Sequence, residues 1–211
     1  MTGAYDKLYV EDAQRALADM LDYAVNTLKY NLKFFYHMFL QSSLSKRFAR
    51  GDVSVISGKS GVEIAREVIE ENTKAACEEG ACYTMERSPE YWTGWALAYY
   101  QWYCGNDFEM IEKEICIDDI CALYHPFHEM DISQFVDRMN ERRQAFRCMA
   151  YLKRLRIAAG LSQKELAMAA DIPLKTIQQY EQRQKNINKA RAEYVIRLSR
   201  VLQCEPEDLL E

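Results

Sequence analysis

The sequence predicts an all-α protein in which a long helix joins an N-terminal helical bundle to a C-terminal domain of five short helices. Apolar side chains recur every three or four residues along most of the chain, which is typical of amphipathic helices. Capping residues, glycines and prolines punctuate these periodic segments. We therefore expect a bundle over residues 1–130, a connecting helix over 131–150 and a small domain over 151–211.

Charge divides the chain at the same place. Residues 151–211 hold 11 basic and 8 acidic side chains, a net charge of +3, whereas residues 1–150 hold 16 and 24, a net charge of −8. Four of the eight acids lie within 205–211, so residues 151–204 alone carry +7. A basic module on an acidic partner domain favours a specific nucleic-acid reader over a general polyanion binder.

In the N-terminal part, helical spacing predicts helices over residues 11–30, 31–47, 60–77 and 88–104, and a polar, aperiodic stretch over 77–87. A short strand is possible at Val53–Ile56. Ser60 and Glu63 form a capping box that opens the third helix. The helix after Ser88 is rich in aromatic residues and apolar nearly all round, which is typical of the buried centre of a bundle. Its tryptophans and tyrosines suit core packing better than the lining of a ligand pocket.

Isoleucines at 111, 115, 117 and 120 continue the core until Pro126 ends that run. Residues 131–159 contain neither glycine nor proline, which predicts a long connecting helix or two nearly merged ones. Arg142, Arg143 and Arg147 on this link are expected to be solvated, with added phosphate contacts as the alternative.

The sequence gives only weak support for a phosphate-binding, metal or catalytic site. Ser57–Ser60 resembles the end of a phosphate loop, but Val53 stands where its first glycine is required. Cysteines 116 and 121 with histidines 125 and 128 lack the spacing of a zinc finger, and buried structural cysteine is the better interpretation. No catalytic triad or carboxylate pair stands out. We expect neither a metal, a cofactor nor an enzymatic activity.

The seven cysteines have no disulfide-framework spacing, no signal peptide is evident, and the longest apolar stretch, residues 91–104, is too short to cross a bilayer. These features predict a cytoplasmic protein with free thiols that makes no membrane contact.

The C-terminal segment is the most informative part of the chain. Gly160 stops one helix, Ser162 and Glu165 form a capping box, and Asp171-Ile172-Pro173 breaks the second helix. The third helix, roughly residues 174–182, buries Ile177 and Tyr180, and its remaining positions are Leu174, Lys175, Thr176, Gln178, Gln179 and Gln182. A fourth helix over 189–202 should turn Ala192, Val195, Ile196 and Leu198 inward, before a final turn over 205–210.

Glutamine pairs bidentately with adenine and lysine donates to guanine, so the polar face of the third helix suits the reading of base edges. The segment resembles the repressor-like (Xre-type) helix-turn-helix family over 152–210, through Leu161-Ser162-Gln163-Lys164-Glu165-Leu166-Ala167 and its closing leucines. The resemblance implies binding of double-stranded DNA through the third helix, as a dimer on half-sites one helical turn apart. It places Leu174, Lys175, Gln178 and Gln179 toward bases, and Gln163 and Thr176 toward phosphates.

Phosphate contacts are also expected from Arg183, Lys185 and Lys189, which follow the third helix. Three positions depart from the family: Asp171 and Arg183 replace common glycines, and Pro173 replaces the usual capping residue. The N-terminal part resembles uncharacterised bacterial regions that precede such modules, through Ser60-Gly61-Val62-Glu63 and Glu90-Tyr91-Trp92-Thr93-Gly94-Trp95-Ala96.

The favoured hypothesis is a sequence-specific transcription regulator of bacterial or phage type, whose N-terminal domain supplies dimerisation, partner docking or sensing. An antitoxin-like protein is the alternative: its N-terminal domain would neutralise a partner protein while the C-terminal domain regulates the operon. An enzyme with a DNA-targeting appendage is the third hypothesis, and no cluster of titratable residues supports it.

Overall fold

The structure is a computed structural model that describes residues 3–74, 80 and 87–211. Every regular element in these residues is helical, which confirms the all-α prediction. The chain divides into two compact units, Met1–Arg143 and Gln144–Glu211, each with its own apolar core. None of the described helices has the length and apolar character that crossing a bilayer requires.

The first unit begins with a 3-10 turn, Lys7–Tyr9, and a π-helical turn, Tyr23–Thr27, follows its first α-helix. Its α-helices are α1 (Val10–Asp22), α2 (Leu32–Gln41), α3 (Ser43–Ala49), α4 (Val53–Ile56), α5 (Gly61–Thr73), α6 (Pro89–Cys104), α7 (Phe108–Glu114), α8 (Ile117–Cys121) and α9 (Tyr124–Phe127). A tenth helix, α10 (Ile132–Arg147), starts in this unit.

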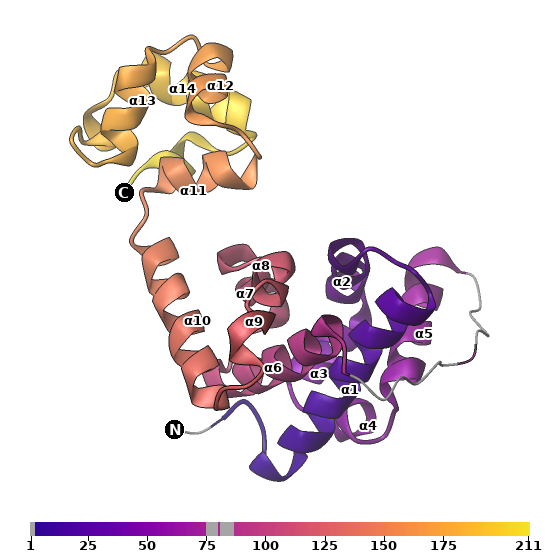
Figure 1. The fold of residues 1–211 in the computed structure, drawn as a ribbon. Coiled ribbons are helices and arrows are strands. Elements are labelled where there is room, and N and C mark those ends of the chain that lie inside the picture. The colour runs from indigo at the N-terminus through magenta and orange to yellow at the C-terminus, as the bar shows by residue number, and fades with distance from the viewer. Residues whose placement is uncertain (1–2, 75–79, 81–86) are drawn as a thin grey trace. The chain divides into compact units, whose positions relative to one another are not determined.

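Helices α1 and α6 lie alongside each other at the centre of the first unit (Figure 1). Gly94 makes this approach possible, because a Cβ atom on it would lie 2.4 Å from the carbonyl oxygen of Leu17. Gly61 brings the start of α5 equally close to α1, with its Cβ position 2.5 Å from the carbonyl oxygen of Ala16. The two glycines therefore set the spacing of the three central helices.

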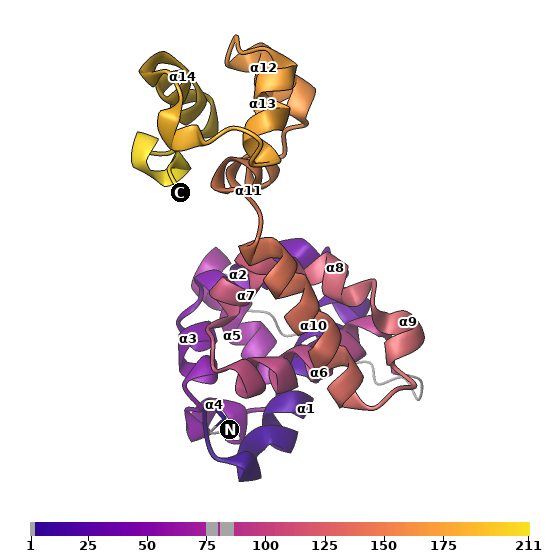
Figure 2. The same ribbon diagram turned by 90° about the vertical axis from the view of Figure 1, so that its left-hand side faces the viewer.

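Aromatic side chains fill the core of the first unit. Phe39, Phe48 and Phe108 meet edge to face, with ring centroids 5.3–6.3 Å apart. Trp92 of α6 meets Phe135 of α10 in the same way, at 5.4 Å and 76°, which holds α10 against α6 (Figure 2). Most of the aromatic stripe thus packs in the core, as its periodicity predicts.

Helix α10 ends at Arg147, and the backbone is extended at Ala150 (ψ 142°), so α10 and the following helix are separate. The expectation that Arg143 is solvated is wrong: its side chain is 10% exposed, and it pairs with Glu114 and donates to the hydroxyl of Tyr100. Arg142 is half-buried and donates to the carbonyl of Asp119 at 3.3 Å.

Two further expectations for the first unit are wrong. The helix expected over 31–47 is two helices, because the backbone is extended at Ser42 (ψ 157°), whose hydroxyl donates to the carbonyl of Phe39. The possible strand at Val53–Ile56 is the helical turn α4, because the Asp52 side chain accepts from the amide of Ser54 and caps it. Glu63 and Ser60 form the predicted capping box. The third predicted helix, α5, ends at Thr73, where Lys74 has a left-handed backbone (φ 57°), so it is shorter than the expected 60–77. Most of the polar stretch over 77–87 lies outside the described residues.

The second unit contains α11 (Tyr151–Ala158), α12 (Gln163–Ala169), α13 (Leu174–Glu181) and α14 (Ala192–Leu202), with 3-10 turns at Ile187–Lys189 and Pro206–Leu209. The five predicted helical segments thus correspond to four α-helices and a closing 3-10 turn. Leu166, Ile177, Leu198 and Leu209 form the centre of its core, each fully buried. Leu198 faces inward as predicted, but Ile196 is 43% exposed and Ala192 is also exposed.

Candidate nucleic-acid interface

The turn between α12 and α13 fixes the direction of α13. Asp171 has a left-handed backbone (φ 51°), the conformation for which glycine is common at this position and which aspartate tolerates. Arg197 of α14 donates to both the carbonyl and the carboxylate of Asp171, at 3.0 and 2.7 Å. Pro173 stands at the N-cap of α13 and provides no side-chain cap. The turn is therefore held by α14 rather than by a local capping bond.

Helix α13 has a buried face and an open face. Ile177, Tyr180 and Glu181 are buried against the unit's core. Leu174 and Lys175 are exposed at the start of the helix, and Gln178 and Gln179 are half-buried one turn later. Residues three and four apart on a helix are neighbours, so the four predicted base-facing residues form one continuous surface.

Lys175, Gln178 and Gln179 keep their hydrogen-bonding groups available. None of the three side chains is hydrogen-bonded to another residue of the described chain. Leu174, 38% exposed, adds an apolar group at the leading end of this surface. The open face of α13 thus offers donors and acceptors that face outward, which base-edge reading requires.

A buried ion pair supports α13 from behind. Arg156 of α11 donates to both carboxylate oxygens of Glu181, at 2.6 and 3.0 Å, in the bidentate arrangement of an arginine–carboxylate pair. Their side chains are only 11% and 2% exposed. Arg156 also donates to the carbonyl of Leu161 at 2.7 Å, so it links α11, the start of α12 and α13.

This pair changes the interpretation of Gln163. The Gln163 amide donates to Glu181 at 2.8 Å, so one of its two N–H groups is already used inside the unit. Its second N–H has no partner within the described residues. Neither Arg156 nor Glu181 was singled out from the sequence, because a charged pair separated by 25 residues gives no local pattern.

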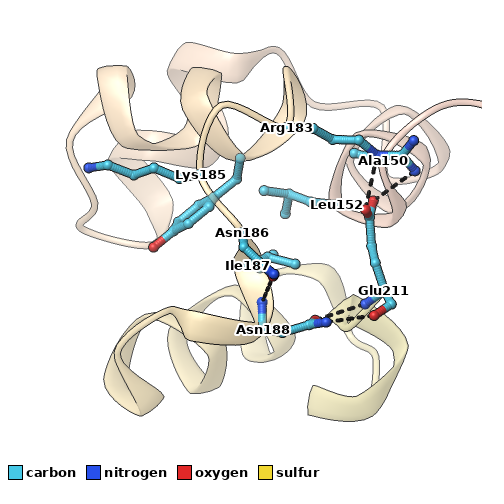
Figure 3. Close-up of a pocket in the computed structure, with 9 residues that line it drawn as sticks. Ala150, Leu152, Arg183, Lys185, Asn186, Ile187, Asn188 and Glu211 are labelled. Carbon is cyan, nitrogen blue, oxygen red and sulfur yellow. Dashed lines mark hydrogen bonds and ion pairs between the residues drawn. The ribbon is translucent and has the colours of Figure 1, made fainter.

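The basic residues after α13 lie on one loop. Arg183 has a left-handed backbone (φ 56°), and its guanidinium pairs with the Glu211 carboxylate at 2.9 Å (Figure 3). The same carboxylate accepts from the backbone amide of Tyr151 at 3.1 Å. Lys185 extends away from Glu211 (Figure 3), and Lys189 is exposed on the 3-10 turn. Arg183 is therefore engaged, whereas both lysines have no ion pair within the described residues.

Thr176 is half-buried on the first turn of α13, where its backbone amide donates to the carbonyl of Pro173 at 2.8 Å and its hydroxyl has no hydrogen bond within the described residues. A small cavity of about 230 Å³ lies beside the loop, between Arg183, Lys185, Asn188 and Glu211 (Figure 3). Asn188 and Glu211 close one side of it through two reciprocal hydrogen bonds, at 2.6 and 2.9 Å.

The alternative sites considered from the sequence have structural roles instead. Ser60 caps α5, as its capping box requires. His125 and His128 meet edge to face, with ring centroids 4.9 Å apart, but within the described residues no group of three metal-ligating side chains comes together. Burial raises the pKa of the Cys116 and Cys121 thiols, so both remain protonated at neutral pH.

Comparison with known proteins identifies the C-terminal unit. Residues 152–209 match the model of the family described as Helix-turn-helix. No curated protein and no solved structure matched the chain. This match confirms the repressor-like, Xre-type helix-turn-helix predicted for these residues, and it supports DNA-binding transcription regulation in general terms. Residues 1–151 lie outside the match.

Proposed function

We propose that the chain is a sequence-specific transcription regulator that binds double-stranded DNA as a homodimer, with α13 of each protomer in the major groove. The open face of α13 carries this proposal, because Lys175, Gln178 and Gln179 stand unpaired beside one another on a helix whose other face is buried. Leu174 would contact a thymine methyl group.

Phosphate contacts would flank this helix. Lys185 and Lys189 supply free cations, Thr176 a hydroxyl, and Gln163 its remaining amide proton. Arg183 would contribute only by exchanging the Glu211 carboxylate for a phosphate. Such contacts set affinity and register without reading the sequence.

The N-terminal residues would provide dimerisation, partner docking or sensing. We propose the same division of labour as the sequence suggests, with residues 1–130 as the partner domain, 131–150 as the link and 151–211 as the DNA reader. Two recognition helices one helical turn apart, about 34 Å, would read a pseudo-palindromic operator. We place this activity in the bacterial cytoplasm.

Selection of bound sequences from random duplex DNA tests the proposal. A site with two-fold symmetry should emerge. Changing Lys175, Gln178 and Gln179 together to alanine should abolish the preference for that site over a scrambled duplex, since each good base contact is worth about tenfold or more. Lys113→Ala with Gln134→Ala, two exposed residues of the first unit, is the matched control and should leave the preference intact.

Survival of site preference in the triple variant would refute the assignment of α13 as the reading helix. The phosphate contacts have a separate signature, because Lys185→Ala and Lys189→Ala should each reduce the salt slope of binding by about 0.9 without changing sequence preference.

Co-purification of a partner protein held by the acidic residues 1–143 would instead support the antitoxin-like function.

A further inference from the structure

A pocket of about 240 Å³ opens on the first unit between α6 and α9. Three side chains of α6, Tyr91, Trp92 and Trp95, form one wall. Tyr124, Phe127 and His128 form the facing wall. Residues more than 25 positions apart thus bring six rings around one cavity, and mostly apolar walls of this kind are typical of small-molecule sites.

The walls of this pocket are held in place by contacts between the residues that line it. Trp92 is 8% exposed and meets Tyr124 edge to face at 5.8 Å. The imidazole of His128 stacks on the ring of Tyr124 at 4.2 Å, and its Nδ1–H donates to the Tyr124 carbonyl at 3.0 Å. These contacts fix the rings of Trp92, Tyr124 and His128 relative to one another, and the other ring nitrogen, His128 Nε2, lies 3.6 Å from the Glu129 carboxylate.

One permanent charge lines the pocket within the described residues, the guanidinium of Arg87. Arg87 is exposed at the edge of the pocket, and its guanidinium lies over the ring of Tyr91, 4.9 Å from the centroid, in a cation–π contact. A guanidinium in this position presents paired N–H donors that match a carboxylate.

We propose that this pocket binds a small planar aromatic anion, with its rings between the tryptophans and Tyr124 and its carboxylate on Arg87. The size supports a molecule of one or two fused rings, because a dry cavity of about 150 Å³ is sufficient for benzene. Aromatic rings pack well edge-on or offset against such walls. This inference does not depend on DNA binding.

Calorimetric titration of the full chain with 2-naphthoate, 2-naphthamide and 2-naphthylmethylamine tests the proposal without any DNA. The carboxylate should bind at least about tenfold more tightly than the amide, and the amine most weakly. Trp95→Ala should abolish binding of all three. Arg87→Gln should remove the preference for the carboxylate while it preserves binding of the amide, an effect that general loss of structure cannot produce.

Trp102→Phe is the matched control, since Trp102 lies on the same helix but its indole N–H donates to the carbonyl of Tyr5, outside the pocket. It should leave all three affinities unchanged. Equal affinity for the carboxylate and the amide, a carboxylate preference that persists in Arg87→Gln, or no binding of any probe at millimolar concentration would each overturn the proposal.

Discussion

Replacing Glu181 alone by leucine should unfold the second unit at moderate temperature, whereas replacing Glu181 and Arg156 together should not. In Glu181→Leu the guanidinium of Arg156, which is 9% exposed, loses both carboxylate contacts and stays buried as an uncompensated charge. Breaking a buried pair in this way costs about 3–5 kcal/mol. For a unit of this size each kcal/mol lowers the melting temperature by about 4–8 °C, so a fall of at least about 12 °C is expected.

The double variant Arg156→Met with Glu181→Leu removes both charges and keeps the volume apolar. Replacement of a complete buried pair by apolar side chains is often close to neutral. The carbonyl of Leu161 loses its bond from Arg156, which costs about 1 kcal/mol. We therefore expect the double variant within about 2 kcal/mol of the native protein, far from the sum of the two single changes.

Calorimetry of the full chain and hydrogen exchange of peptides from residues 151–209 measure this effect. Tryptophan fluorescence is unsuitable, because the three tryptophans at 92, 95 and 102 all lie in the first unit. Arg183→Met is the control: its pair with Glu211 is exposed (52% and 26%), so its loss should cost at most about 1 kcal/mol. The reasoning fails if Glu181→Leu melts no lower than this control, or if the single effects add in the double variant.

Three other substitutions test the packing, the titration and the backbone. Gly94→Ala should destabilise the first unit by about 1–3 kcal/mol, because the added Cβ would lie 2.4 Å from the carbonyl oxygen of Leu17. Unfolding in urea followed by tryptophan fluorescence measures this change. Helix propensity alone predicts a gain in stability, and such a gain would contradict the close approach of α6 to α1. Burial raises the pKa of Glu112 to about 7, so the folded state binds more protons than the unfolded state between pH 4.5 and 7. The free energy of unfolding of the first unit should therefore fall as pH rises through that window, and Glu112→Gln should remove this fall. Identical pH profiles of stability for the native protein and Glu112→Gln would disprove the role of Glu112. Gln203 has a left-handed backbone (φ 53°) at the end of α14, so Gln203→Gly should stabilise the second unit by roughly 1 kcal/mol. The melting temperature of this unit should rise accordingly, and a lower melting temperature would count against backbone strain at residue 203.

The helices and their ends could be predicted well wherever the determining residues are close in sequence. The capping boxes at Ser60 and Ser162 and the left-handed stop at Gly160 all form as predicted. Each depends on residues within about four positions, so the pattern is complete in the sequence itself. The short apolar run at Val53–Ile56 was misinterpreted because periodicity over four residues does not distinguish a strand from a helical turn.

The candidate DNA-reading surface was predictable to a similar extent. The family resemblance and the three- and four-residue spacing on α13 identify the open face. What each flanking residue does could not be predicted, because Gln163 meets Glu181 across 18 positions and Arg183 meets Glu211 across 28. Such partners are selected by packing, and packing leaves no local pattern.

By itself, the sequence determined that this protein is helical, where most helices begin and end, and that its C-terminal part is a helix-turn-helix domain. Only the tertiary structure decided that Arg143 is buried, that Arg156 and Glu181 brace α13, and that aromatic rings of α6 and α9 line a pocket. The physical reason is range: caps and helical periodicity act within one or two turns, whereas ion pairs and cavities arise when distant segments are brought together by burial of apolar surface.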